Sequence, residues 1–440
     1  MPPRPSREQP GPHAAATRKA RQRDPLGFSG PRPSPDARRI LLARALRGFA
    51  DGLVSVLLAG YLIGIGFTPV QVGAIVTATL LGSAALTIVL GLAGHRLERR
   101  RILLGASVLM LATGLGFAGI TAFWPLLAIA VLGTLNPSAG DVSVFLPAEQ
   151  AALAQTTAAR DRTGMFAWYN VGGNFAGALG ALATGAPWLL AKAGGAGSDR
   201  PNRLGFVLYS AIAVVTGIVY RRLGRSVETG RDAIGGSLAR SRRIVVQLAA
   251  LFSLDSFGGG FVVQSLLALW LYRRFDLSPS ATAGIFFATG ILGALSQLVS
   301  PPLAARIGLV RTMVYTHLPA NLLLVAAGLV PSAPLAITCL LLRAALSQMD
   351  VPARQALVMA VVPPEERAAA ASVTNVPRSL AAALPPLFAG MMLDRSAVGW
   401  PLVCGGLLKA AYDLLLLAQF RAVAARGDGH EDEAADQLEQ

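Results

Sequence analysis

The feature that most constrains this chain is a succession of long apolar segments separated by short polar stretches. A helix needs roughly 20 apolar residues to cross about 30 Å of hydrocarbon, and twelve segments of the chain reach that range. They are residues 40–65, 70–94, 102–123, 125–152, 164–191, 204–223, 244–272, 279–304, 309–330, 334–361, 368–393 and 398–420. Backbone polar groups have no water to bond inside a bilayer, so such segments must be helical. We therefore predict an all-α membrane protein with twelve transmembrane helices.

The composition agrees with a bilayer as the solvent. Only 14% of the 440 residues are charged, and the mean hydropathy is +0.53. The 47 glycines and 28 prolines would interrupt soluble helices, whereas membrane helices tolerate both. The net charge of +15 is compatible with nucleic-acid binding, but no polar segment interleaves basic with aromatic residues. We expect no nucleic-acid partner.

The positive charge is better explained by topology. Residues 1–39 are rich in Pro and Arg and predict a disordered basic tail, with no apolar run that would mark a cleavable signal peptide. Only six Lys and Arg residues lie in the odd-numbered loops: Lys192, Arg200, Arg203, Arg273, Arg274 and Arg395. The positive-inside rule then predicts that both termini are cytoplasmic. Residues 224–243 form a cytoplasmic linker and 421–440 a cytoplasmic tail of a protein of the inner (plasma) membrane.

The chain also repeats itself. Shifts of 205 to 210 residues align Arg96 with Arg306, Arg101 with Arg311, Asp141 with Asp350, Arg162 with Arg367 and Asn170 with Asn375. Polar matches carry this argument, because apolar identities arise easily by chance in membrane helices. The repeat predicts two pseudo-symmetric six-helix halves, residues 40–223 and 244–420. Parallel repeats of this kind place a substrate site near the bilayer midplane.

The loop after the second segment carries a charged motif, Gly91-Leu-Ala-Gly-His95-Arg96-Leu-Glu98-Arg99-Arg100. It resembles GxxxDRxGRR, the signature between helices 2 and 3 of the major facilitator superfamily, and the resemblance covers residues 40–420. His95 replaces the usual Asp, and Glu98 replaces the second Gly. The second half keeps Arg306, Gly308 and Arg311 at the corresponding place.

This resemblance implies the fold of the superfamily and secondary transport by alternating access. It also implies that the loop latches the cytoplasmic ends of neighbouring helices, which makes Gly91, His95, Arg96, Arg99, Arg100, Arg306 and Arg311 gate candidates. Ordinary interfacial anchoring remains an alternative for Arg99 and Arg100. The imidazole of His95 titrates near neutral pH and would change the latch. Expected partners are the bilayer, a small-molecule substrate and protons, and the protein is expected to act as a monomer without a cofactor.

One aspartate lies near mid-depth in each of the first, fourth, seventh and tenth segments: Asp51, Asp141, Asp255 and Asp350. A charged residue at a helix centre costs about 2.5–3.5 kcal/mol on insertion scales and normally faces the bundle interior. The resemblance implies that these four helices line the central cavity. Burial favours the protonated form of a carboxyl group, so such residues can load and release a proton. Asp51 and Asp255 are the preferred proton-coupling candidates.

Structural roles compete with this interpretation. Ion pairs are expected between Arg47 and Asp51 and between Asp350 and either Arg343 or Arg354. Arg343 could instead meet an anionic substrate. Lys409 and Asp413 stand four residues apart, a spacing that predicts mutual neutralisation on one helical face.

The fifth segment is unusually rich in glycine. Gly173-xxx-Gly177 predicts close approach to a neighbouring helix. The segment also matches loosely the GxxxGPxxGG motif in span 5 of drug/proton antiporters of the superfamily. Close packing and an antiporter signature both stay open.

The leading hypothesis is a proton-coupled exporter of small organic compounds. The alternatives are an uptake symporter or facilitator and, less favoured, a transporter-like sensor or assembly protein, which would need a folded soluble domain. No Gly-rich phosphate loop, nucleophile motif or metal-ligand spacing indicates an enzyme or a metal site.

Overall fold

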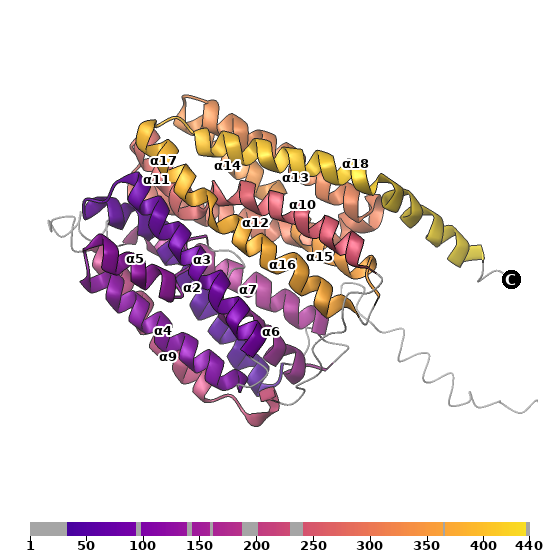
Figure 1. Ribbon diagram of the computed structural model, residues 1–440, viewed down its shortest axis with the longest axis horizontal. Coiled ribbons are helices and arrows are strands. Elements are labelled where there is room, and N and C mark those ends of the chain that lie inside the picture. Colours follow the sequence, from indigo (N-terminus) through magenta and orange to yellow (C-terminus); the bar gives the residue numbers. More distant parts are fainter. Residues whose placement is uncertain are drawn as a thin grey trace, which may run out of the picture.

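The computed structural model describes residues 33–93, 98–138, 143–158, 162–186, 201–228, 241–363 and 366–436. Within these ranges the protein is a helical bundle without strands, in which ten segments are long and apolar enough to cross a membrane. Figure 1 shows two groups of helices, α2 to α9 and α10 to α18, that lie side by side along most of the molecule. This is the predicted all-α architecture of two halves.

The first half contains seven α-helices and one short 3-10 helix among the described residues. They are α2 (Pro35–Gly64), α3 (Pro69–Ala93), α4 (Arg99–Gly119), α5 (Phe123–Leu132), α6 (Phe145–Thr156), α7 (Arg162–Ala183), α9 (Pro201–Arg221) and η3 (Arg225–Glu228). Helix α2 begins five residues before the predicted start at residue 40. Ser34 caps this helix by accepting a hydrogen bond from Ala37 N at 3.1 Å, and Pro35 suits the first helical position.

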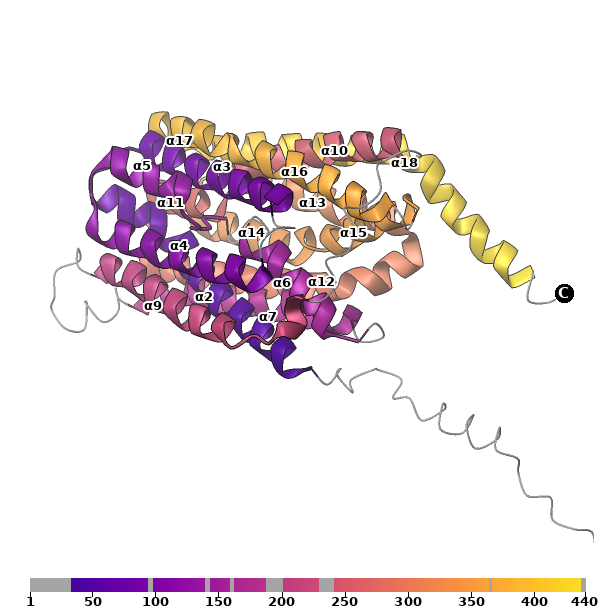
Figure 2. The same cartoon turned by 60° about the horizontal axis from the view of Figure 1, so that its bottom comes forward.

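The second half contains nine helices in the described residues. They are α10 (Arg242–Gly260), α11 (Gln264–Phe275), α12 (Pro279–Ile307), α13 (Leu309–Leu329), α14 (Ala333–Ser347), α15 (Asp350–Ala360), α16 (Arg367–Ala383), α17 (Pro385–Arg395) and α18 (Trp400–Asp436). Helix α18 continues beyond the predicted end at residue 420 and extends away from the bundle (Figure 2).

Four predicted spans are pairs of helices rather than continuous ones. Span 4 consists of α5 and α6, span 7 of α10 and α11, span 10 of α14 and α15, and span 11 of α16 and α17. Proline explains the break at Pro385, because it cannot donate to the helical ladder and its ring clashes with the preceding turn. The breaks of spans 4 and 7 meet, since Ser265 N donates to Pro137 O at 3.2 Å. Irregular backbone is tolerated at membrane depth where protein covers it.

The halves contact each other through α3 with α16 and α17, α7 with α12, and α2 with α11. The contacts are tight at the end away from the chain termini, hereafter the far end. A Cβ atom on Gly73 would lie 2.5 Å from Pro386 O, and one on Gly185 would lie 3.0 Å from Ser280 Cα. The far end is therefore closed between the halves.

Within the first half, α2 and α7 pack through glycines. A Cβ atom on Gly52 would lie 1.9 Å from Gly177 O, and one on Gly48 would lie 2.4 Å from Gly173 O. Small residues at this spacing let two backbones approach closely in a membrane. Gly173 and Gly177 thus form the α2 contact of span 5.

Candidate functional site: two buried charge clusters

The first half contains an ion pair between its first and fourth spans. Arg47 of α2 pairs with Glu149 of α6, and their side chains are 1% and 0% exposed. Two phenol hydroxyls also donate hydrogen bonds to the Glu149 carboxylate: Tyr169 of α7 donates to Oε2 at 2.5 Å, and Tyr220 of α9 donates to Oε1. The guanidinium also donates to the Ser143 hydroxyl at 3.2 Å. We call these five residues the N-cluster; its charges are balanced and its acceptors are filled.

Asp51 lies one turn along α2 from this cluster and is 8% exposed. Its carboxylate bonds Asn136 in the break of span 4 and is electrostatically close to Arg44 and Arg47. The predicted ion pair between Arg47 and Asp51 is wrong, because the Arg47 guanidinium pairs with Glu149 instead. Asp51 is thus a buried carboxylate close to two cations, neither of which forms a salt bridge with it among the described residues.

The second half contains a larger charged group centred on Asp255 of α10. Lys409 of α18 donates to Asp255 Oδ1 at 2.5 Å, and Arg354 of α15 donates to Oδ2 at 3.2 Å. The same Arg354 nitrogen lies 3.4 Å from Asp350 Oδ2. Of the two partners predicted for Asp350, the structure places Arg354 in contact. First and fourth spans are again paired, with the polarity reversed relative to Arg47 and Glu149.

A histidine extends this group toward the twelfth span. His317 Nδ1 lies 2.9 Å from Asp413 Oδ1, and Nε2 lies 3.8 Å from Asp255 Oδ1. Asn321, one turn further along α13, donates to Asp413 Oδ2 at 2.8 Å. We call the seven residues Asp255, His317, Asn321, Asp350, Arg354, Lys409 and Asp413 the C-cluster. All of them are less than 9% exposed.

The predicted pairing of Lys409 with Asp413 is wrong. Lys409 reaches across to Asp255 on α10, whereas Asp413 faces His317 and Asn321 on α13. Spacing along one helix favoured the local pair, but the two side chains face different neighbouring helices. Sequence reasoning also missed Glu149 and His317, although each is an ionisable residue inside an apolar segment, where such residues are rare and normally face the bundle interior.

Arg343 of α14 is electrostatically close to Asp255 and Asp350. Its buried Nε has no hydrogen-bond partner among the described residues. A guanidinium offers five N–H donors, and leaving them unmet in an apolar interior is unfavourable. Arg343 is therefore the candidate with unused capacity to bind an acceptor group.

The predicted gate residues are only partly described. His95 and Arg96 lie outside the described residues, as does the predicted cavity residue Asp141, and Gly91 lies in the last turn of α3. Arg306 is exposed in the last turn of α12, and Arg311 is partly buried near the start of α13.

Arg99 and Arg100 open α4, where the linker reaches them. Glu228 accepts hydrogen bonds from both backbone nitrogens at 2.9 Å, and the Arg99 side chain donates to Val227 O at 2.8 Å. A carboxylate at a helix N-terminus satisfies free N–H groups and opposes the helix dipole. The start of the linker is also held by Asp36, which accepts from the Ser226 hydroxyl at 2.7 Å. The linker therefore begins as a part of the first half.

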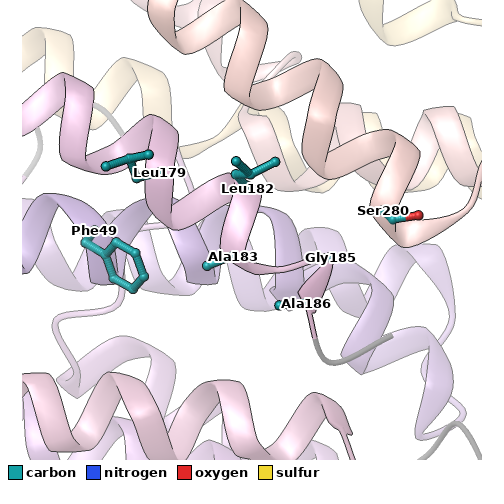
Figure 3. A pocket seen from close by; sticks show the side chains of 7 residues that line it. All are labelled: Phe49, Leu179, Leu182, Ala183, Gly185, Ala186 and Ser280. Atoms are coloured by element: carbon teal, nitrogen blue, oxygen red, sulfur yellow. The ribbon is translucent and has the colours of Figure 1, made fainter. Parts of the chain in front are cut away.

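An apolar pocket of about 450 Å³ lies between α2, the end of α7 and the start of α12, which belongs to the second half (Figure 3). Phe49, Leu179 and Leu182 are its larger side chains, and Ser280 is its polar member. Leu179 and Leu182 are 38% and 41% exposed. The pocket therefore opens on the outer surface of the bundle, and no charged residue lines it.

Two similar helical halves with ionisable residues buried between their helices define a polytopic membrane transporter. The family model of the Major Facilitator Superfamily matches residues 40–386. The chain belongs to this superfamily.

Two relatives are similar in sequence. Over 431 residues the chain is 25% identical to YJR124C, an uncharacterized membrane protein of Saccharomyces cerevisiae, with 89% of this chain and 96% of the relative covered. Over 157 residues it is 28% identical to the multidrug efflux protein YfmO of Bacillus subtilis, with 35% of this chain and 39% of that protein covered.

Solved structures share the fold. A D-xylose-proton symporter aligns with a TM-score of 0.67 at 16% identity, covering 86% of this chain and 97% of that one. The nucleoside transporter NupG aligns with a TM-score of 0.64 at 14% identity, covering 88% and 99%. A bacterial homolog of the human lysosomal transporter Spinster, inward-facing and unoccupied, gives 0.64 at 17% identity, covering 89% and 98%.

Proposed function

We propose that this protein is a proton-coupled exporter of small organic compounds that works by alternating access. The observation that carries the proposal is the placement of Asp51 and Asp255 on the first helix of each half, both buried and both beside cations. A buried carboxylate can exchange a cation for a proton when its surroundings change. Such an exchange would link protonation to the movement of one half against the other.

The export direction is supported by the partial relative YfmO, which is named a multidrug efflux protein. The apolar pocket on the outer surface of the bundle would suit a lipophilic solute but does not indicate a direction. Uptake of a metabolite is the alternative, since the D-xylose-proton symporter and NupG share the fold. With cytoplasmic termini in a plasma membrane, the far end is the outer side, and the contacts between the halves there separate the interior from the outside.

The test combines growth and transport. Strains that lack or overproduce the protein are compared for resistance to ethidium and for growth on uridine and D-xylose. Export predicts a change in ethidium resistance, and uptake predicts a change in growth. Purified protein is then reconstituted in liposomes with an imposed pH gradient, and the responding probe is followed.

In liposomes, Asp51→Asn or Asp255→Asn is expected to lower the rate of uphill substrate transport at least about tenfold. Proton transfer by a positioned side chain typically changes a rate by roughly 10²- to 10⁴-fold. Downhill exchange should persist, because Asn keeps the shape and hydrogen bonding of Asp without ionising. Asp394→Asn on the exposed end of α17 is the matched control and should behave as wild type. Full gradient-driven transport in both single variants and in the double variant would contradict the proposal.

A further inference from the structure

The imidazole of His317 lies between two carboxylates of different helices. Its Nδ1 faces Asp413 of α18 at 2.9 Å, and its Nε2 faces Asp255 of α10 at 3.8 Å. The side chain is 4% exposed. An imidazole can accept a proton at one nitrogen while it releases another from the second. The arrangement is thus suited to pass a proton between the carboxylates.

The two carboxylates differ in their partners. Asp255 has Lys409 at 2.5 Å and Arg354 at 3.2 Å, and two cations at this distance favour its ionised form. Asp413 is completely buried and is bonded by His317 and Asn321, neither of which carries a fixed charge. A buried carboxylate without a cation is strongly unfavourable, so a proton belongs on Asp413 or on the imidazole.

The charged and titratable groups around the imidazole come from four helices besides α13. They are Asp255 on α10, Arg343 on α14, Asp350 and Arg354 on α15, and Lys409, Tyr412 and Asp413 on α18. Asp255, Asp350 and Asp413 balance Arg343, Arg354 and Lys409 in number. One proton more or less on the His317–Asp413 pair therefore sets the net charge of this interior.

We propose that His317 and Asp413 store one proton and pass it to Asp255 when Asp255 loses a cationic partner during the transport cycle. The separation of 3.8 Å exceeds hydrogen-bond length, so the transfer waits for the approach of span 7. The proton leaves Asp413 Oδ1 for Nδ1 while Nε2 releases its own proton to Asp255 Oδ1. One carboxyl group ionises, the other is neutralised, and the imidazole stays neutral.

This inference rests on the proposed function for its role in transport, but proton storage can be measured without a substrate. Infrared difference spectra of the purified full chain, recorded in H₂O and D₂O, report a protonated carboxyl group through its C=O stretch. We expect such a band in wild type, its loss in Asp413→Asn, and its retention in Tyr412→Phe. Tyr412 is the matched control: it neighbours both residues, and its hydroxyl has no hydrogen-bond partner among the described residues.

His317→Gln tests the relay. The amide keeps hydrogen bonding but cannot pass a proton from one side chain to the other, so the Asp413 band should persist while Asp255 no longer receives the proton. In liposomes, uphill movement should fall at least about tenfold, as expected for loss of a positioned proton carrier. Size-exclusion profiles show whether each variant is folded, and Asp413→Glu serves if Asp413→Asn aggregates, because it should restore the band.

Two results would overturn the inference: a C=O band that survives in Asp413→Asn, or a His317→Gln variant with wild-type uphill transport. Wild-type transport that ignores the pH gradient would contradict the proposed function instead, and the infrared result would then still decide whether the pair stores a proton.

Discussion

The two halves use different side chains to join the same pair of spans. Each ties its first span to its fourth by a buried ion pair, Arg47 with Glu149 in one half and Asp255 with Arg354 in the other. In the N-cluster the remaining partners are phenols and a hydroxyl, which keep their protons near neutral pH. In the C-cluster they are a lysine, a histidine, an asparagine and two further carboxylates.

The difference indicates that the N-cluster fixes helices in place, whereas the C-cluster can change its protonation state. A balanced pair surrounded by neutral donors has no second arrangement of similar energy, so the N-cluster fixes spans 1, 4, 5 and 6 together. The C-cluster can redistribute one proton among several acceptors, and its Asp255 can trade partners. We infer that the N-cluster holds the first half as a rigid body, in which Asp51 outside the cluster is the group that exchanges a proton, whereas the second half changes its charge state within the C-cluster itself.

Glu149→Leu should produce the largest loss of stability. It leaves the Arg47 guanidinium buried without a carboxylate, and breaking a buried pair in this way costs about 3–5 kcal/mol. Thermal unfolding of the purified protein in detergent provides the measurement. The double variant Arg47→Met with Glu149→Leu should recover most of the loss, because replacing both charges removes the unpaired ion. Equal stability of Glu149→Leu and wild type would contradict the claim that the N-cluster stabilises the first half.

The second effect compares tyrosines in the two halves. Tyr169 donates to Glu149 at 2.5 Å, whereas the Tyr412 hydroxyl has no hydrogen-bond partner among the described residues. Hydrogen bonds to charged groups contribute about 1.5–3 kcal/mol, so Tyr169→Phe should destabilise by that amount. Tyr412→Phe should leave the unfolding midpoint nearly unchanged. Similar losses in both variants would show that ring packing, rather than the phenol hydrogen bond, stabilises the N-cluster.

The sequence predicts the helices and most of the buried carboxylates that distinguish the halves, but not which residues pair. Twelve apolar segments, an internal repeat and a carboxylate at mid-depth in spans 1, 7 and 10 follow from residue type and spacing alone. The ion pairs do not follow from the sequence, because Arg47 and Glu149 are 102 residues apart and Asp255 and Lys409 are 154 residues apart. Which faces meet depends on how each helix is rotated in the bundle. For Lys409 and Asp413 the local spacing therefore indicated the wrong partner.

Glycine packing offers a third test of the rigid half. A Cβ atom on Gly52 would lie 1.9 Å from Gly177 O, so Gly52→Ala must push α2 and α7 apart. Overpacking of this kind costs about 1–3 kcal/mol. Gly172→Ala is the matched control on α7, because a Cβ there meets no atom within 4 Å and alanine favours a helix. If both variants lost the same stability, close packing of α2 on α7 would not be what holds the half together.

The smallest expected effect concerns the start of the linker, which the structure attaches to the rigid half. Glu228 accepts hydrogen bonds from Arg99 N and Arg100 N at 2.9 Å, as a capping carboxylate does at a helix N-terminus. Glu228→Gln keeps an acceptor but removes the charge that opposes the helix dipole, so the loss should be about 0.3–1 kcal/mol and should shrink as salt is added.

Glu98→Gln provides the control for that measurement. Glu98 pairs with Arg101 at 3.0 Å, but both side chains are largely exposed, so its loss should shift the unfolding midpoint less than Glu228→Gln does. A salt-dependent loss confined to Glu228→Gln would assign the first residues of the linker to the first half. No difference between the two variants would mean that the Glu228 cap adds nothing to the stability of the first half.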